Sequence, residues 1–246
     1  MKDNFSVQSA QYAKFRPSYP DELYSYLLTI VEHTHAAWDC GTGNGQVAHK
    51  LAKYFDVVYA TDISQQQLDN AIQRPNIIYS KAPAEHSAFP DNSFDLITVA
   101  QAIHWFDFDG FYKEINRTIK HNGILAVIGY GLLKTDDNLD PVIEHFYDHI
   151  IGPYWDKERR YIDENYQSIP FPFKEIEPIH LTLQYEWNFE QLIGFFNTWS
   201  AVQHYINDKG KDPVDNIHDQ LKECWGKEDV KTIRFPLLLR IGRVEK

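Results

Sequence analysis

Three glycines at alternate positions form the part of the sequence best suited to hold a ligand. They are Gly41, Gly43 and Gly45, and Asp39 precedes the first of them by two residues. Glycine has no side chain, so it lets a backbone turn tightly and approach a bound group closely. The helix expected directly after the turn would add its free N-terminal N–H groups. A dinucleotide-binding turn needs GxGxxG, whereas the sixth position here is Gln46, so the spacing argues against NAD.

A second acidic residue, Asp62, follows about twenty residues later, where a ribose diol would need an acceptor. Asp62 directly follows the β-rich run 57–61. Ser64 and Gln67 then have the spacing of a capping box, which predicts that a helix begins there. Asp62 is therefore expected at the carboxyl edge of a sheet, where open α/β sheets bind ligands. Glycine turns and capping acids also occur singly without a ligand, but their order here favours a nucleoside cofactor.

These motifs, in this order, resemble those of the class I S-adenosylmethionine-dependent methyltransferases, whose first motif is an acidic residue followed by GxGxG. The resemblance covers residues 35–130 and includes the segments 91–97 and 101–106. It implies methyl transfer with S-adenosylmethionine as the cofactor. The segments 12–20 and 198–203 are similar to a small-molecule branch that includes the trans-aconitate methyltransferase-like proteins.

The resemblance also assigns residues to the parts of the cofactor. It places Ala84 and Glu85 at the adenine, with Ile63 packed on the ring, and Gln101 at the methionine portion. Glu85 could instead be a solvated acid of a loop, and Gln101 a plain strand terminator.

The segment 1–20 resembles a lid over the cofactor carboxylate. Tyr12, Arg16 and Tyr19 would close it, with Arg16 as the ion partner of the carboxylate. The alternative is a frayed terminus.

Acceptor-binding residues are expected after the fourth strand and in the last third of the chain. His104 could be a general base, a hydrogen-bond partner of the substrate or a structural residue, and Trp105 would act through its shape. Trp199 and Gln203 are four residues apart, so they share a helix face and are candidates for the acceptor pocket. The aromatic residues around them could equally form a satellite core.

Composition narrows the class of partner. The 246 residues include 24 Lys and Arg against 35 Asp and Glu, a formal charge of −11, which disfavours nucleic acid. Cys40 and Cys224 have no partner at ligand spacing, so neither a metal site nor a disulfide framework is expected. No signal core or spanning segment is evident, which predicts a cytosolic protein without membrane contact, either a monomer or a homodimer.

The order of the elements predicts an α/β fold with a doubly wound, mostly parallel seven-stranded sheet and an antiparallel last strand. Strands are expected near 36–40, 57–61, 76–80, 94–100 and 124–130, with connections long enough for crossover helices, such as Asp109 to Lys120. Residues 179–187 alternate apolar and polar side chains, and 233–241 would pair with them. Pro236 predicts a bulge or an edge position, because it has no N–H for the ladder.

A chain of this length and apolar content predicts a single domain, 1–246. Its expected parts are a lid (1–20), a cofactor-binding core (21–131), cap insertions (132–177 and 188–229) and terminal strands (178–187 and 230–246). The cap would lie over the carboxyl edge of the sheet, beside the cofactor.

The sequence therefore predicts an S-adenosylmethionine-dependent methyltransferase with a small-molecule acceptor. An ionised carboxylate acceptor would need no base, whereas a phenol or amine would give His104 a catalytic role. Two rival readings stay open, an NAD-dependent oxidoreductase and a non-catalytic module that binds S-adenosylmethionine.

Overall fold

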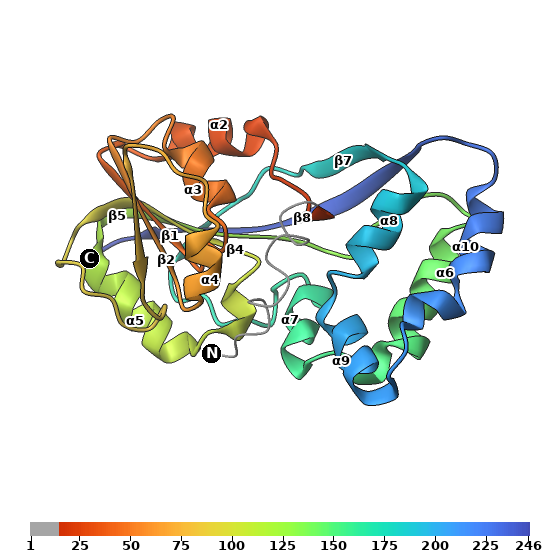
Figure 1. Ribbon diagram of the computed structural model, residues 1–246. Helices are drawn as coiled ribbons and strands as arrows, with labels where there is room; N and C mark the ends of the chain where they lie inside the picture. The colour runs from red at the N-terminus through yellow and green to blue at the C-terminus, as the bar shows by residue number, and fades with distance from the viewer. Residues whose placement is uncertain (1–14) are drawn as a thin grey trace.

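A computed structural model of the chain describes residues 15–246 (Figure 1). The α-helices are α2 (Asp21–Ile30), α3 (Gln46–Leu51), α4 (Gln65–Asp69), α5 (Phe108–Thr118), α6 (Asp140–His145), α7 (Arg160–Asp163), α8 (Phe189–Phe196), α9 (Ser200–Lys209) and α10 (His218–Trp225). The strands are β1 (Ala36–Cys40), β2 (Val57–Asp62), β3 (Ile77–Lys81), β4 (Phe94–Ala100), β5 (Ile119–Tyr130), β6 (Lys174–Ile176), β7 (Thr182–Trp187) and β8 (Lys231–Val244).

The strands form one sheet in the order β3-β2-β1-β4-β5-β8-β6. The first five of these are parallel, and β8 runs antiparallel to β5. This arrangement confirms the doubly wound, mostly parallel sheet with an antiparallel last strand. The described sheet has eight strands rather than the expected seven, because β7 also pairs with β8 beside this path.

The long strand β8 changes partner along its length. Its second half pairs with β5 from Leu237 onward and with β6, whereas its first half pairs with β7 up to Pro236. The change falls at the residue that cannot donate to a ladder. The strand β6 lies in the segment 132–177, which was expected to be a cap insertion only, so that expectation was incomplete.

Apolar side chains alternate between the two faces of the sheet. Ala37 and Ile124 belong to the core under α2 and α3, whereas their neighbours Trp38 and Leu125 belong to the core under α5. This alternation buries both faces, as a parallel sheet between layers of helices requires. Helix α5 ends at Thr118 and β5 begins one residue later, so the expected helix to Lys120 was too long.

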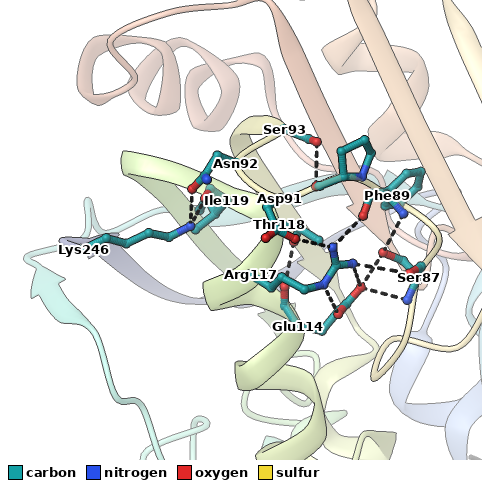
Figure 2. Close-up of polar contacts among 11 residues, drawn as sticks. Ser87, Phe89, Asp91, Asn92, Ser93, Glu114, Arg117, Thr118, Ile119 and Lys246 are labelled. Carbon is teal, nitrogen blue, oxygen red and sulfur yellow. Dashed lines mark hydrogen bonds and ion pairs between the residues drawn. The ribbon is translucent and has the colours of Figure 1, made fainter.

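The connection between β3 and β4 is fastened to α5 by one arginine. Figure 2 shows the Arg117 guanidinium bonded to both Glu114 oxygens, to Asp91 and to the carbonyl groups of Ser87 and Phe89. All three of its nitrogens have partners within the chain. This network fixes the loop on the α5 side of the sheet.

The helices α6 to α10 form a second lobe beside the sheet, and β7 and β8 extend toward it (Figure 1). Helix α8 begins with a full capping box formed by Asn188 and Gln191. The lobe is packed with aromatic rings that continue the core beneath α2 and α3. Within residues 15–246, no helix has both the length and the apolar composition that a membrane crossing would need.

Candidate active site

The glycine turn follows β1 and has the backbone conformation that its sequence predicted. Gly41, Gly43 and Gly45 have φ angles of +71°, +55° and +80°, a region that residues with a side chain rarely adopt. A Cβ atom on Gly41 would lie 2.7 Å from the Cβ of Ala102, and one on Gly45 would collide with the Tyr79 hydroxyl. At Gly43, by contrast, nearby space is open. The first and third glycines are therefore needed for packing, and the second leaves room in front of the turn.

Asp39, which precedes the glycine turn in β1, stabilises the turn through its carboxylate. Its Oδ2 accepts hydrogen bonds from the Thr42 hydroxyl (2.5 Å) and the Ala48 N–H (3.1 Å), and its Oδ1 accepts one from the Thr98 hydroxyl (2.8 Å). Burial raises the pKa of Asp39 to about 6, although these three hydrogen bonds act in the opposite direction. The carboxyl thus ties together β1, β4 and the start of α3.

Asp62 holds the next strand end against the glycines. Its Oδ2 accepts a hydrogen bond from the Gly43 N–H and its Oδ1 accepts one from the Ser64 N–H, both at 2.9 Å. The Ser64 hydroxyl in turn accepts from the Gln67 N–H and caps α4. The strand-to-helix junction predicted around Asp62 is therefore present.

The turn faces a hollow at the carboxyl edge of the sheet, which we call the cofactor hollow. Seven of the residues predicted for the cofactor line it, namely Arg16, Asp39, Gly41, Gly43, Asp62, Ile63 and Gln101, whereas Gly45 does not. Other lining residues, among them Val47, Phe106 and Tyr130, were not singled out in the sequence. Phe106 could have been found, because it ends the segment 101–106 that carried the resemblance.

Ala84 and Glu85 do not line the cofactor hollow. Ala84 is buried in the core beneath α5. The Glu85 carboxylate accepts a hydrogen bond from the Asp107 N–H (2.9 Å), at the N-cap of α5. These two residues, expected at the adenine, therefore lie outside the lining of this hollow, and Glu85 is held at the start of α5.

Gln101 has a strained backbone where β4 ends. Its φ is +52°, which costs energy for a residue with a side chain. Its N–H donates to the Ile128 carbonyl (2.8 Å), and its side-chain amide donates to the Tyr130 carbonyl (3.0 Å). Strain that the surroundings maintain in this way is typical of a functional position.

The described part of the expected lid also reaches the cofactor hollow. Tyr19 and Arg16 both line it. The Arg16 guanidinium donates to the Tyr130 hydroxyl (3.1 Å) and the Thr198 carbonyl (3.0 Å). Tyr12 lies outside the described residues.

A second hollow adjoins the first, and we call it the acceptor hollow. Its lining residues are Arg16, Gln101, His104, Trp105, Trp155, Asp156, Arg159, Ile162 and Ser200. Arg16, Gln101 and Trp105 line both hollows. They form the boundary between the two hollows, which we call the shared wall.

Of these two hollows, His104 lines the acceptor hollow only, and it is buried, with 6% of its surface exposed. Neither of its ring nitrogens makes a hydrogen bond within the described residues, and Nδ1 is fully enclosed. Burial, together with the charges of Arg159 and Arg16, lowers the pKa of His104 to about 3. The imidazole is therefore neutral near pH 7 and can offer or accept a hydrogen bond, but it holds a proton poorly.

Trp199 and Gln203 do not line either hollow. Trp199 is 3% exposed and packs against five aromatic rings, those of Phe146, Tyr147, Trp155, Phe195 and Phe196. The Gln203 amide donates to the Asn197 carbonyl. The structure therefore does not bring these two predicted pocket residues to the acceptor hollow, and Trp199 belongs to the core of the lobe. The neighbouring Ser200 lines the acceptor hollow instead.

The cofactor hollow fits S-adenosylmethionine. It has open space over Gly43, a carboxylate at the end of β2 where a ribose would lie, apolar walls from Ile63 and Phe106, and a guanidinium from Arg16. The sheet order and this hollow define a class I methyltransferase.

Comparisons with known proteins agree. A family model described as a methyltransferase domain matches residues 38–127. A Dictyostelium discoideum protein whose name assigns it to the methyltransferases is 35% identical over 251 residues, covering 99% of this chain and 95% of that protein. The chain belongs to the class I S-adenosylmethionine-dependent methyltransferases, and S-adenosylmethionine is its cofactor.

Solved structures support the same assignment. A protein from Anaeromyxobacter dehalogenans, described as a type II methyltransferase, has a TM-score of 0.87 at 34% identity, covering 94% of this chain and 99% of that chain. A Haemonchus contortus phosphoethanolamine N-methyltransferase, solved in complex with S-adenosyl-L-methionine, has a TM-score of 0.51 at 16% identity. It covers 98% of this chain and 57% of its own, and at that identity it supports the fold alone.

Proposed function

We propose that this enzyme transfers the methyl group of S-adenosylmethionine to a small molecule bound in the acceptor hollow. The observation that carries the proposal is the shared wall of Arg16, Gln101 and Trp105, which lines both hollows. Reactants bound in the two hollows would therefore lie next to each other at these three residues. Such alignment is a large source of rate enhancement.

The chain's own residues have positioning roles in this scheme. Bound S-adenosylmethionine supplies an electrophilic methyl group, so the difficult chemistry is in the cofactor. Asp39 and Asp62 hold the glycine turn in shape, and Asp62 is the residue proposed to bind the ribose. Gln101 would contact the methionine portion, and Arg16 its carboxylate. The aromatic side chains Trp105 and Phe106 exclude water from the junction of the two hollows.

A carboxylate suits this site best as the acceptor group. It is ionised near neutrality, so it can attack without losing a proton first. A phenol or an amine would need a base, and the lowered pKa of His104 makes that side chain a weak one. We assign to His104 a hydrogen bond to the acceptor and to Trp105 a role in shaping the hollow. A carboxylate acceptor also agrees with the proposed place in the trans-aconitate methyltransferase-like branch.

The remaining features of the proposal follow from the sequence. The net charge of −11 disfavours nucleic acid as a substrate. We therefore propose a cytosolic enzyme of one domain, a monomer or a homodimer, in which residues 1–20 close over the cofactor and the segments 132–177 and 188–229 cap the acceptor.

Calorimetry and a methylation screen test the function. S-adenosylmethionine and S-adenosylhomocysteine should bind at micromolar concentrations and NAD far more weakly. Radiolabelled methyl from S-adenosylmethionine should then appear on a member of a screen of small acids, phenols and amines. Tighter binding of NAD would favour an oxidoreductase, and cofactor binding without transfer to any class of acceptor would favour a non-catalytic module.

A further inference from the structure

Arg159 occupies an unusual place in the wall of the acceptor hollow. Its Nε donates to the Tyr147 hydroxyl (2.6 Å) and lies 3.4 Å from the Asp163 carboxylate. The guanidinium carbon lies 4.7 Å from the Trp155 ring centre and 5.3 Å from that of Tyr147. Only 16% of the side chain is exposed. The aromatic rings and Nε thus fix the orientation of the group.

The two terminal nitrogens of Arg159 are the part left for a ligand, because they make no hydrogen bond to any residue from 15 to 246. Three other partly buried arginines differ. Arg117, Arg240 and Arg243 each use both terminal guanidinium nitrogens in hydrogen bonds within the chain. A fixed guanidinium with open terminal nitrogens is suited to bind an anion with two parallel hydrogen bonds.

His104 provides a second and independent sign of a ligand in the same hollow. Its imidazole is more than nine-tenths buried and has no hydrogen-bond partner among the described residues. A buried polar group left without a partner costs stability, so native chains seldom keep one unless something else satisfies it. His104 and Arg159 come from segments about fifty residues apart and meet at this hollow.

The charges around the hollow limit the kind of anion. Among the lining residues from 15 to 246, Arg16 and Arg159 contribute two positive charges, and Asp156 contributes one negative charge. The nearby Asp163 is 44% exposed, so solvent screens its effect. An excess of one positive charge favours a single carboxylate over a phosphate dianion.

We infer that Arg159 is a specificity-determining residue that binds a carboxylate of the acceptor together with His104. This inference rests on the proposed function, since it names what the acceptor hollow selects. Arg159 lines the acceptor hollow but not the cofactor hollow. The carboxylate that it binds is therefore an anchor, and the acceptor atom lies nearer the shared wall.

Binding measurements on the enzyme saturated with S-adenosylhomocysteine test the inference without turnover. The probes are glutarate and para-hydroxybenzoate, each compared with its neutral amide, glutaramide and para-hydroxybenzamide. At least one acid should bind more tightly than its amide. Arg159→Gln should weaken the binding of that acid by about tenfold or more, which is the loss expected when a charge-assisted hydrogen-bonded pair is removed. Arg159→Lys should recover only part of the affinity, because it keeps the charge but not the two parallel donors.

Arg160→Gln is the matched control. It removes the same charge one residue away, where the side chain lies over Tyr161 and does not line the acceptor hollow. Its acid affinity should equal that of the parent. Thermal unfolding and S-adenosylhomocysteine affinity, measured on every variant, separate a loss of the fold from a loss of the anion site.

Three outcomes would overturn the inference. The acids and their amides could bind with equal affinity, the Arg159→Gln variant could bind the acid as tightly as the parent does, or neither acid could bind at millimolar concentration. These failures are distinct from failure of the proposed function, which would show as absent S-adenosylhomocysteine binding or as absent methyl transfer in the wider screen.

Discussion

The cofactor hollow and the acceptor hollow satisfy their polar groups in opposite ways. In the first, Asp39 and Asp62 accept their hydrogen bonds from the backbone and hydroxyl groups of the chain itself. In the second, His104 and the terminal nitrogens of Arg159 have no partner among residues 15–246. The two carboxylates of the first hollow are thus held by the chain, whereas His104 and Arg159 of the second keep groups that a ligand would satisfy.

The difference predicts how each region responds to change. Substitutions around the glycine turn should damage structure and cofactor binding together, because the same bonds serve both. Substitutions at His104 or Arg159 should leave the fold intact and alter the interaction with the acceptor. The following predictions begin with the strongest test of this contrast.

The largest effect is expected from Gly41→Ala. The new Cβ would lie 2.7 Å from that of Ala102, at a φ of +71°. Positive φ costs an alanine roughly 1–2 kcal/mol, and overpacking adds about 1–3 kcal/mol. Urea unfolding should show this loss, and calorimetry should show S-adenosylhomocysteine binding weakened by more than about tenfold.

Gly210→Ala is the control for backbone strain alone. Its φ is +69°, but no atom lies within 4 Å of the new Cβ. It should lose about 1–2 kcal/mol of stability and bind S-adenosylhomocysteine as the parent does. Equal behaviour of the two variants would mean that close packing at Gly41 is unimportant.

Asp62→Ala should have the next largest effect. It removes the acceptor of the Gly43 and Ser64 N–H groups as well as the proposed ribose contact. The cost to S-adenosylmethionine binding should be about 1.5–3 kcal/mol, as for loss of a charged acceptor. Asp62→Asn keeps one acceptor oxygen, so its affinity for S-adenosylmethionine, measured by calorimetry, should lie between those of the parent and of Asp62→Ala. Unchanged affinity in Asp62→Ala would reject the ribose assignment.

The sequence predicted the first of these regions well because its interactions are local. The turn, Asp39 and Asp62 all lie within about twenty-five residues, and periodicity gave β1 and β4 their observed bounds. Backbone rules for glycine, capping and strand ends act at short range, so a single sequence carries them.

The acceptor region could not be predicted in the same way. Arg159 has no motif, and its importance arises only when packing brings it beside His104 and Trp155. Trp199 was a plausible pocket residue, since a helix face alone does not show whether it meets a ligand or a core. The course of the loop after Ala84 and Glu85 was equally hidden, because Arg117 and Asp107, which lie more than twenty residues further along the chain, hold that loop.

The pH dependence of stability offers a further test of the acceptor hollow. The folded-state pKa of His104 is about 3, below the unfolded value near 6.5. As the pH falls below about 6.5, the unfolded chain gains a proton on this histidine that the folded chain does not. The contribution of His104 to the free energy of unfolding therefore declines by up to about 1.4 kcal/mol per pH unit. Asp39 has the opposite effect on the free energy of unfolding. Its pKa is about 6 in the folded chain and near 3.8 in the unfolded chain, so the folded chain binds the proton more tightly and lowering the pH from about 6 to 3.8 stabilises the fold through this group.

His104→Gln removes one of these two opposing contributions. Urea unfolding at pH 7 and pH 5.5 should therefore show the variant gaining about 1 kcal/mol relative to the parent as the pH is lowered. If the stabilities of the variant and the parent changed equally with pH, the imidazole of His104 would be readily protonated in the folded chain. His104 would then not be a buried group without a partner, and the contrast between the acceptor hollow and the cofactor hollow would lose this support.

The smallest effect is expected for the activity of His104→Ala. If the acceptor group is a carboxylate, no proton must leave before attack, so the variant should show only a modest rise in KM or fall in kcat, without a new pH dependence. If the group is a phenol or an amine, removing a general base should cost about 10²–10⁴-fold in rate. Initial rates across neutral and alkaline pH, on the acceptor found by the screen, separate the two mechanisms, and His104→Gln shows whether a hydrogen bond alone suffices. Activity identical to that of the parent in both variants would make His104 a structural residue, and the polar contrast between the two hollows would then rest on Arg159 alone.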